Sequence, residues 1–138
     1  MVENPPGGYP RISPYLYYED VGAALRWLGE AFGFSERLRM DGPDGTIGHA
    51  EMELDGGVIM LGRPSGGYES PARHGHSHHL VHVYVDDVDA HFARAEAAGA
   101  KIVAPVETKP YGDRNYIAED PEGQQWTFSQ HVEDVEFG

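Results

Sequence analysis

The sequence predicts an α+β fold in which two βαβββ modules form a curved mixed sheet with a concave cavity, with the helices on the outer face. The first reason is an internal repeat. The motif at 18–21 recurs at 85–88, and the Asp-Gly pair at 55–56 recurs as Glu-Gly at 122–123, with an offset of 67 residues (85 − 18). The second reason is periodicity, because each half passes from strand-like alternation to one amphipathic helix and back. The third is composition, since 138 residues with 40% hydrophobic content support a globular domain.

The first module is expected to span residues 12–62, after a proline- and glycine-rich lead-in at 1–11. Asp20 is a suitable N-cap for a helix at 21–31, because its carboxylate accepts free backbone N–H groups of the first turn. Gly33 is a suitable end for that helix. The strands expected in this module are 12–18, 34–40, 46–54 and 58–61.

The second module is expected to span residues 80–131, after a connector at 63–79 that shows no periodicity. Asp87 is predicted to cap a helix at 88–98, which Gly99 ends. The strands expected in this module are 80–85, 101–105, 114–119 and 124–130.

Composition excludes several classes of function. The chain has no cysteine, which excludes disulfides and thiolate chemistry and favours a cytoplasmic location. The net charge of −13 and the scattered basic residues argue against nucleic-acid binding. No apolar run is long enough for a membrane span, so no membrane association is expected. Residues 132–138 form an acidic tail that is expected to be solvated.

Several motifs of the second half carry a family resemblance. Tyr-Gly-Asp-Arg at 111–114, Asp-Pro-Glu-Gly at 120–123, and Trp126 with Phe128 together resemble the vicinal oxygen chelate superfamily, and residues 83–92 strengthen the likeness. This group contains glyoxalase I, bleomycin-resistance proteins, extradiol dioxygenases and fosfomycin-resistance enzymes. The resemblance implies the paired βαβββ fold and a homodimer with two equivalent pockets. It does not by itself imply one activity, because the fold supports many chemistries.

The resemblance also implies where a metal would be held in related enzymes. Metal-using members place ligands at two positions of each module. These positions correspond here to Ser13, Met60, Leu80 and Thr127. Leucine has no donor atom, a thioether is a soft ligand, and neutral hydroxyls are weak ligands. We therefore expect that the usual metal site is absent and that no metal or cofactor is bound there.

Strand alternation predicts which residues line the concave face. Val81, Val83 and Val85 should pack toward the helix, so the residues between them face the cavity. The same reasoning in the other strands, with Tyr116 taken as the repeat partner of His49, gives the expected ligand-binding wall. It consists of Tyr15, Tyr17, His49, Met60, Leu80, His82, Tyr84, Tyr116 and Thr127. Such a wall suits stacking against a flat ligand, with hydroxyl and imidazole groups to orient it. The alternative is that these tyrosines fill a closed core.

These expectations favour a metal-independent small-molecule binding protein of the glyoxalase/bleomycin-resistance type. Its ligand would be an aromatic or cationic, antibiotic-like compound that Glu51 and the tyrosine rings attract. The alternative is an enzyme of the same superfamily, a glyoxalase-like lyase, an isomerase or a dioxygenase. In that case His49, Glu51 and His82 are the candidate catalytic residues, because imidazole and carboxylate groups suit proton transfer. A third alternative is a structural or regulatory interaction module.

Three further signals receive a less specific interpretation. The connector holds four histidines, His74, His76, His78 and His79. A glycine-spaced surface loop is not expected to hold fixed geometry, which favours an incidental or weak metal site there. Arg114 is expected to form an ion pair, with Asp113 or with a ligand carboxylate. His91 is expected to lie on an exposed helical face without a special role.

Overall fold

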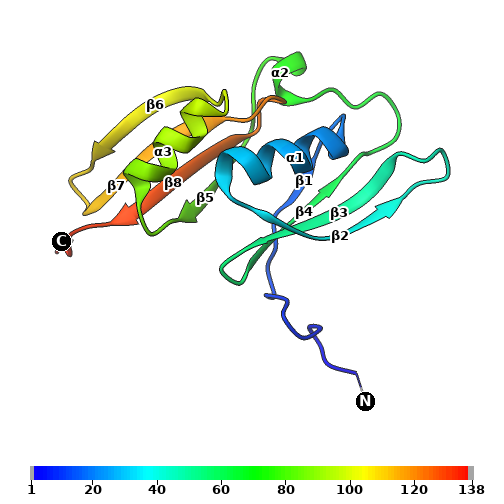
Figure 1. Ribbon diagram of the computed structural model, residues 1–138, viewed down its shortest axis with the longest axis horizontal. Coiled ribbons are helices and arrows are strands. Elements are labelled where there is room, and N and C mark those ends of the chain that lie inside the picture. Colours follow the sequence, from blue (N-terminus) through cyan, green and yellow to red (C-terminus); the bar gives the residue numbers. More distant parts are fainter. Residues whose placement is uncertain (1, 137–138) are drawn as a thin grey trace. The chain divides into compact units, whose positions relative to one another are not determined.

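The computed structural model describes residues 2–136, and the chain divides into two compact units, residues 1–69 and residues 70–138. Met1 and the last two residues of the expected acidic tail lie outside the described residues. Each unit contains one four-stranded mixed sheet and one long helix, which confirms the predicted α+β fold of two βαβββ modules (Figure 1). Within the described residues, no helix is long and apolar enough to cross a membrane.

Unit 1 follows the predicted order of elements. They are β1 (Tyr15–Tyr17), α1 (Val21–Phe32), β2 (Ser35–Asp41), β3 (Ile47–Leu54) and β4 (Gly57–Gly62). The strand order is β1-β4-β3-β2, with β1 parallel to β4 and the other pairs antiparallel. Strand β1 is shorter than the predicted strand at 12–18, and Ile12 lies outside it with 87% of its surface exposed.

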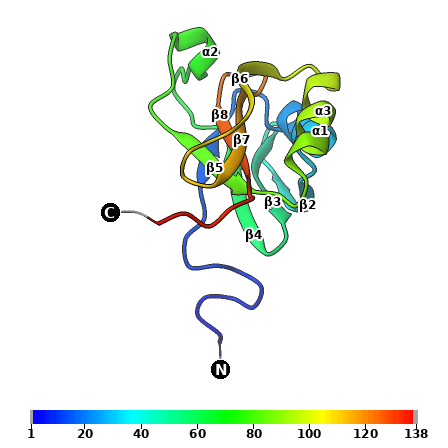
Figure 2. The same cartoon turned by 90° about the vertical axis from the view of Figure 1, so that its left-hand side faces the viewer.

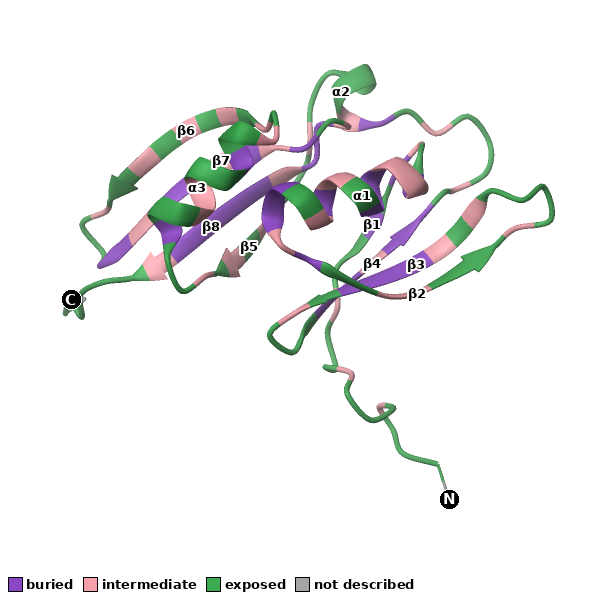
Figure 3. Cartoon of the chain, in the orientation of Figure 1, coloured by how far each residue is buried: buried purple, intermediate pink, exposed green. Residues whose placement is uncertain are grey.

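Helix α1 covers one face of this sheet and closes the core of unit 1. Asp20 caps it as expected, because its Oδ1 accepts a hydrogen bond from the backbone N–H of Ala23 at 3.0 Å. Gly33 ends the helix in the left-handed conformation, with φ of 84°. The largest fully buried side chains of this core are Leu16, Tyr18, Leu28, Phe32, Met52 and Leu61 (Figure 3). One face of the sheet is therefore fully packed, and the opposite face is available for other roles.

Unit 2 repeats the architecture with one addition. Its elements are α2 (Pro71–His74), β5 (Leu80–Tyr84), α3 (Val88–Ala97), β6 (Lys101–Thr108), β7 (Asp113–Glu119) and β8 (Gln125–His131). The strand order is β5-β8-β7-β6, with β5 parallel to β8. The short helix α2 lies within the predicted connector, which the sequence pattern treated as irregular. Figure 2 shows α2 beyond one end of the sheet and away from α3.

The core of unit 2 lies between α3 and its sheet. Asp87 caps α3 by accepting a hydrogen bond from the backbone N–H of Ala90 at 3.1 Å. Under the helix the rings of Trp126 and Phe128 are stacked, with centroids 6.0 Å apart. The Phe128 ring in turn stacks on Tyr116 at 5.5 Å. Stacked aromatic rings therefore form the centre of the unit 2 core.

The strand register places Tyr116 on the helix-covered face, so its predicted position on the concave wall is wrong. Met60 and Thr127 differ by the repeat offset of 67 residues (127 − 60). Their neighbours on the adjacent strand are Glu51 and Ile117, which differ by only 66 (117 − 51). The turn between β7 and β8 thus shifts the repeat by one residue. A shift of one residue moves a strand side chain to the other face, and Tyr116 is fully buried there.

Candidate functional site

The face of the unit 1 sheet that α1 does not cover, the unit 1 open face, carries aromatic and titratable side chains. Along β1, Tyr15 and Tyr17 are 46% and 50% exposed and flank the buried Leu16. Their rings meet edge to face, with centroids 5.9 Å apart. Met60 of β4 lies opposite both Tyr15 and Glu51 in the strand register. Residues from three strands therefore share one surface.

A glycine on β4 allows Tyr15 to lie flat against the sheet. A Cβ atom at Gly62 would come within 2.5 Å of the Tyr15 hydroxyl oxygen, so only glycine leaves room for the ring. With this space available, the Tyr15 hydroxyl lies 2.8 Å from Nδ1 of His49 on β3. The sequence pattern placed Gly62 after the predicted strand at 58–61, as the last residue of the first module. Its role appears only once the strands are paired.

Glu51 is the buried anchor of this face, with 7% of its surface exposed. Its Oε2 lies 3.0 Å from Nε2 of His49, and its Oε1 accepts a hydrogen bond from the Tyr9 hydroxyl at 2.5 Å. Burial opposes ionisation, but the hydrogen bonds from Tyr9 and His49 outweigh it and lower the pKa of Glu51. The ionised carboxylate only accepts hydrogen bonds. In the neutral imidazole, Nε2 therefore carries the hydrogen and Nδ1 accepts from Tyr15.

These contacts form one continuous chain of polar groups, which we call the Tyr–His–Glu relay. It comprises Tyr15, His49, Glu51 and Tyr9. Burial, with contributions from Tyr17 and Glu51, raises the pKa of the exposed end member, Tyr15. The relay thus keeps a neutral phenol hydroxyl at the surface, held by an imidazole whose orientation a buried carboxylate determines.

Two residues of this face were not predicted from the sequence. Tyr9 belongs to the expected extended lead-in, yet it is held against the sheet, where the Arg37 guanidinium lies 4.3 Å from its ring centroid. Arg37 also donates a hydrogen bond to the Gly8 carbonyl at 2.8 Å. Tyr68 donates to the Tyr17 carbonyl at 3.0 Å. The only sequence signal for Tyr9 and Tyr68 was that they are aromatic residues in segments expected to be loops. This signal did not indicate which residues they contact.

The corresponding face of the unit 2 sheet, the unit 2 open face, is also partly aromatic. Leu80 and Tyr84 of β5 are 44% and 60% exposed. Between them, His82 lies 2.9 Å from the Ser129 hydroxyl through its Nε2. The rings of His82 and Tyr84 meet at 4.7 Å in an edge-to-face arrangement. Thr127 lies opposite His82 in the register and is nearly buried.

A buried carboxylate also anchors the unit 2 open face. Asp113 accepts a hydrogen bond from the Tyr84 hydroxyl at 3.0 Å, and its other oxygen lies 2.8 Å from Nδ1 of His131. The hydrogen bond with His131 has the largest effect on the pKa of Asp113 and lowers it. The hydrogen bond with Tyr84 lowers it further, although burial opposes the shift. The sequence pattern gave Asp113 only a role as a partner of Arg114. Each open face therefore carries a tyrosine and a histidine held by one buried acid.

Of the three candidate catalytic residues, the structure brings His49 and Glu51 together in unit 1. His82 belongs to unit 2, where its partner is Ser129. The expectation that His91 has no special role is wrong. Its Nδ1 lies 2.6 Å from the Tyr116 hydroxyl, and its ring packs 4.2 Å from Phe128. His91 and Tyr116 thus stabilise the core beneath α3.

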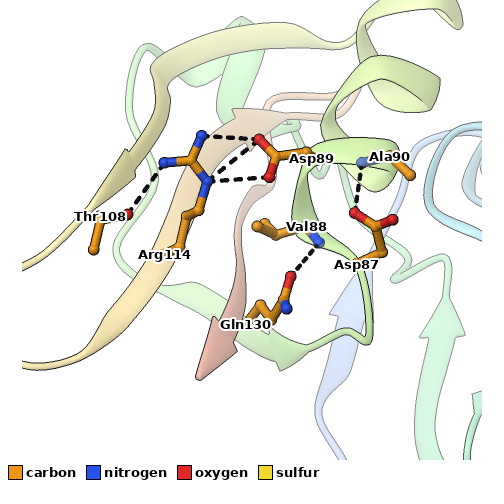
Figure 4. A network of polar contacts seen from close by, with 7 residues as sticks. All are labelled: Asp87, Val88, Asp89, Ala90, Thr108, Arg114 and Gln130. Carbon is orange, nitrogen blue, oxygen red and sulfur yellow. Dashed lines mark hydrogen bonds and ion pairs between the residues drawn. The ribbon is translucent and has the colours of Figure 1, made fainter. Parts of the chain in front are cut away.

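Arg114 forms an ion pair, but with neither of its expected partners. Its guanidinium donates to both carboxylate oxygens of Asp89 on α3, at 2.9 to 3.3 Å, and to the Thr108 hydroxyl at 3.1 Å (Figure 4). This pair lowers the pKa of Asp89. Because Arg114 is next to Asp113 in β7, it points to the opposite face of the sheet. The pair is therefore part of the helix-side scaffold.

The residues at the family's metal positions do not provide a suitable donor set. Met60 and Thr127 offer a thioether and a neutral hydroxyl, and Leu80 offers no donor atom. Ser13 is the residue before Pro14, whose carbonyl accepts a hydrogen bond from the Met60 N–H at 2.9 Å. These two positions thus adjoin each other, but a serine hydroxyl and a thioether are poor ligands for a divalent cation of the Mg²⁺ or Zn²⁺ type. No chemical step is therefore assigned to a metal at these positions.

Two hollows within the units are lined by other residues than the predicted wall. One in unit 2 has a volume of about 500 Å³ and is bordered by α2, the β7–β8 turn and His76. Another, in unit 1, has a volume of about 380 Å³ and lies beside the start of α1, near Arg63. None of the predicted wall residues lines either hollow. The open faces are therefore candidate sites because of their exposed aromatic rings and titratable side chains.

Comparison with known sequences finds one matching family and several related proteins. A family model described as Glyoxalase/Bleomycin resistance protein/Dioxygenase superfamily matches residues 10–128. An uncharacterized protein of Mycobacterium bovis is 36% identical over 131 residues, which cover 91% of this chain and 86% of that protein. An uncharacterized protein of Bacillus subtilis is 29% identical over 118 residues, covering 83% of this chain and 92% of that protein.

Solved structures agree with the sequence relatives. The crystal structure of TioX from Micromonospora sp. ML1 is 41% identical, with a TM-score of 0.74, and the match covers 89% of this chain and 99% of TioX. The fosfomycin resistance protein FosX from Listeria monocytogenes is 14% identical, with a TM-score of 0.65, and the match covers 88% of this chain and 92% of FosX. At that identity FosX shows a common fold and no more.

Proposed function

Because this chain belongs to the Glyoxalase/Bleomycin resistance protein/Dioxygenase superfamily, we propose that it is a metal-independent binding protein for a flat aromatic or cationic small molecule. The observation that carries the proposal is the set of half-exposed aromatic rings on the two open faces. Tyr15, Tyr17 and Tyr84 are each held in place through a contact with a neighbouring ring. Rings that are rigid and exposed lose little conformational entropy when a planar ligand stacks on them.

Electrostatics supports a cationic ligand. The chain carries a net charge of −13, which attracts cations over the whole surface. The lowered pKa of Glu51 keeps a carboxylate ionised at neutral pH on the same face as Tyr15. A delocalised cation stacked on tyrosine also gains cation–π attraction. A neutral aromatic ligand would use the same rings without this contribution.

Calorimetric titration of chelator-treated protein tests the proposal. The probes are bleomycin, a planar acridinium dye as a simple cation, and a naphthalene sulfonate as an anionic aromatic of similar size. We expect saturable binding of at least one cationic probe, unchanged by the chelator, and weaker binding of the sulfonate. Absence of binding by all the aromatic probes, or binding that requires added metal, would contradict the proposal.

Variants identify the surface involved. Tyr15→Ala and Tyr84→Ala each remove one exposed ring, and we expect at least one of them to weaken binding by about tenfold, the value of a lost stacking contact of about 1.4 kcal/mol. Tyr116→Phe is the matched control, because it changes a tyrosine on the helix side of the sheet. Equal losses in all three variants would indicate damage to the fold rather than loss of a binding surface.

The Tyr–His–Glu relay supports a second candidate, an enzyme that catalyses proton transfer. In the neutral relay the Tyr15 hydroxyl donates to the unprotonated Nδ1 of His49. Tyr15 can therefore take a proton from a substrate while its own proton passes to Nδ1, and Glu51 stabilises the imidazolium that forms. The reverse transfer returns a proton to the substrate and restores the relay. A lyase or isomerase reaction on a small carbonyl compound requires groups of this kind. This candidate reaction uses only residues of unit 1.

Turnover of the methylglyoxal–glutathione hemithioacetal, with and without added divalent metals, tests this second candidate. An enzyme that uses the relay should lose most of its kcat in both His49→Gln and Tyr15→Phe. Tyr17→Phe is the control, since Tyr17 lies beside Tyr15 but outside the relay. Activity that survives in His49→Gln would exclude the relay as its source, and absence of turnover leaves the binding protein as the proposed function.

We further propose that the chain forms a homodimer, as the family resemblance implies. The exposed aromatic rings of the open faces support association or ligand binding, because large apolar side chains are costly to leave in water. Light scattering coupled to size-exclusion chromatography measures the mass directly. A monomer of 15.2 kDa at micromolar concentration would contradict the dimer without affecting the binding measurements.

A further inference from the structure

Three histidines of the segment between α2 and β5 come together on the surface of unit 2. His74, His76 and His78, which we call the histidine triad, each offer one ring nitrogen, and these atoms lie within 4.8 Å of one another. The ring centroids of His74 and His76 are 4.8 Å apart, and those of His76 and His78 are 4.6 Å apart. All three side chains are exposed. The glycine-spaced sequence of this segment did not predict that the three rings come together.

The N-terminal side of the triad is attached to the sheet of unit 2. His74 is the last residue of α2. The backbone N–H of Ala72, in the same helix, donates to the Glu122 carbonyl in the β7–β8 turn at 3.0 Å. Gly123 packs so closely against Ala72 that a Cβ there would lie 2.5 Å from the Ala72 nitrogen. The first histidine is thus carried by a helix in direct contact with a hairpin turn.

The rest of the triad follows from local backbone geometry. Gly75 adopts a left-handed conformation with φ of 118°, and its N–H donates to the Pro71 carbonyl at 2.8 Å, which turns the chain after α2. Ser77 then donates from its hydroxyl to the His79 carbonyl at 2.9 Å, just before β5 begins. These contacts hold the backbone at both sides of His76 and bring alternate residues to one side of the segment.

From this arrangement we propose that the histidine triad binds one borderline divalent cation of the Zn²⁺ or Ni²⁺ type. Neutral imidazole suits these metals, whereas Mg²⁺ and Ca²⁺ require oxygen ligands. With metal–nitrogen bonds of about 2.0–2.1 Å, nitrogens around a tetrahedral ion lie about 3.4 Å apart. The exposed histidines therefore need to approach one another by at most about 1.4 Å, which rotation of exposed side chains permits.

The proposed site differs from the family's metal position in both location and ligands. It uses none of Ser13, Met60, Leu80 or Thr127. Three protein ligands leave a further coordination position for water or a small anionic ligand, as in catalytic zinc sites. His76 and the neighbouring Ser77 also border the hollow of about 500 Å³ in unit 2, which provides room for such a ligand.

Calorimetric titration of the full chain with Zn²⁺ tests the proposal, and Ni²⁺ and Mg²⁺ serve as comparison ions. We expect one Zn²⁺ per chain with micromolar affinity at pH 7.5, measurable binding of Ni²⁺ and none of Mg²⁺. At pH 5.5 the binding should largely disappear, because protonated imidazole is not a ligand. Proton NMR should show that Zn²⁺ shifts the ring signals of the three triad histidines.

His76→Asn is expected to weaken Zn²⁺ binding by about 100-fold or more, because loss of even a supporting residue commonly costs about 10- to 100-fold. His79→Asn is the matched control, since it lies in the same segment but outside the triad. Equal weakening by both variants, several equivalent ions per chain, or only millimolar affinity would overturn the proposal. Tyr15→Ala should bind Zn²⁺ normally, so failure of this proposal is distinguishable from failure of the proposed ligand binding.

Discussion

Replacing two tyrosines that the repeat placed on one face, Tyr15 and Tyr116, tests the face assignment directly. Tyr116 is fully buried, its ring lies 5.1 Å from Phe92, and its hydroxyl bonds to His91 at 2.6 Å. Removing a buried aromatic side chain costs about 3–5 kcal/mol of the free energy of unfolding. Tyr15 is 46% exposed, so Tyr15→Ala loses only about half of a buried side chain's transfer energy, about 1 kcal/mol.

Urea unfolding followed by circular dichroism measures both values. We expect Tyr116→Ala to be less stable than Tyr15→Ala by about 2 kcal/mol or more. Tyr116→Phe keeps the ring and removes only the hydroxyl, so it should cost about 1 kcal/mol, the usual value of one hydrogen bond. If Tyr15→Ala were as destabilising as Tyr116→Ala, the register of β7 and the face assignment derived from it would be refuted.

Three further variants, one of them with a control, test the contacts that support the two open faces and the core. Gly62→Ala should displace the Tyr15 ring and abolish its hydrogen-bonded NMR signature, because the added Cβ would lie 2.5 Å from the hydroxyl, and an unchanged signal would contradict the close contact. Asp113→Asn should be less stable than wild type at pH 7. The difference should begin to shrink as the pH falls below about 4, the pKa of the unfolded carboxyl, and disappear once the pH is below the lowered pKa of Asp113 in the fold, because only the ionised form gains stability from these contacts. A pH-independent difference in urea titrations would contradict this. Asp120→Ala should cost about 2–3 kcal/mol, since the buried carboxylate accepts two backbone N–H groups and an indole N–H. The exposed turn variant Asp44→Ala should cost about 1 kcal/mol or less, and equal costs in thermal unfolding would argue against burial as the reason.

Much of the candidate site was predictable, because alternation along a strand is a local property. The exposure of Tyr15 and Tyr84 and the lower exposure of their strand neighbours Leu16 and Val83 follow from a period of two residues. The hydrogen-bond partners were not predictable. His49 reaches Tyr15 only because Gly62 leaves space between them, and such a contact depends on which strands pair and in what register.

Local pattern alone determined the two modules of this protein, their helix caps and the apolar side of each sheet, since these depend on neighbours within a few residues. Contacts between distant segments appear only in the folded chain. One extra residue in the β7–β8 turn shifts the register of β7, which places Tyr116 beneath α3. The N-terminal segment folds back so that Tyr9 donates a hydrogen bond to Glu51. Contact between α2 and that same turn helps to position the histidines that precede β5. In each case the deciding contact joins residues whose separation along the chain carries no periodic signal.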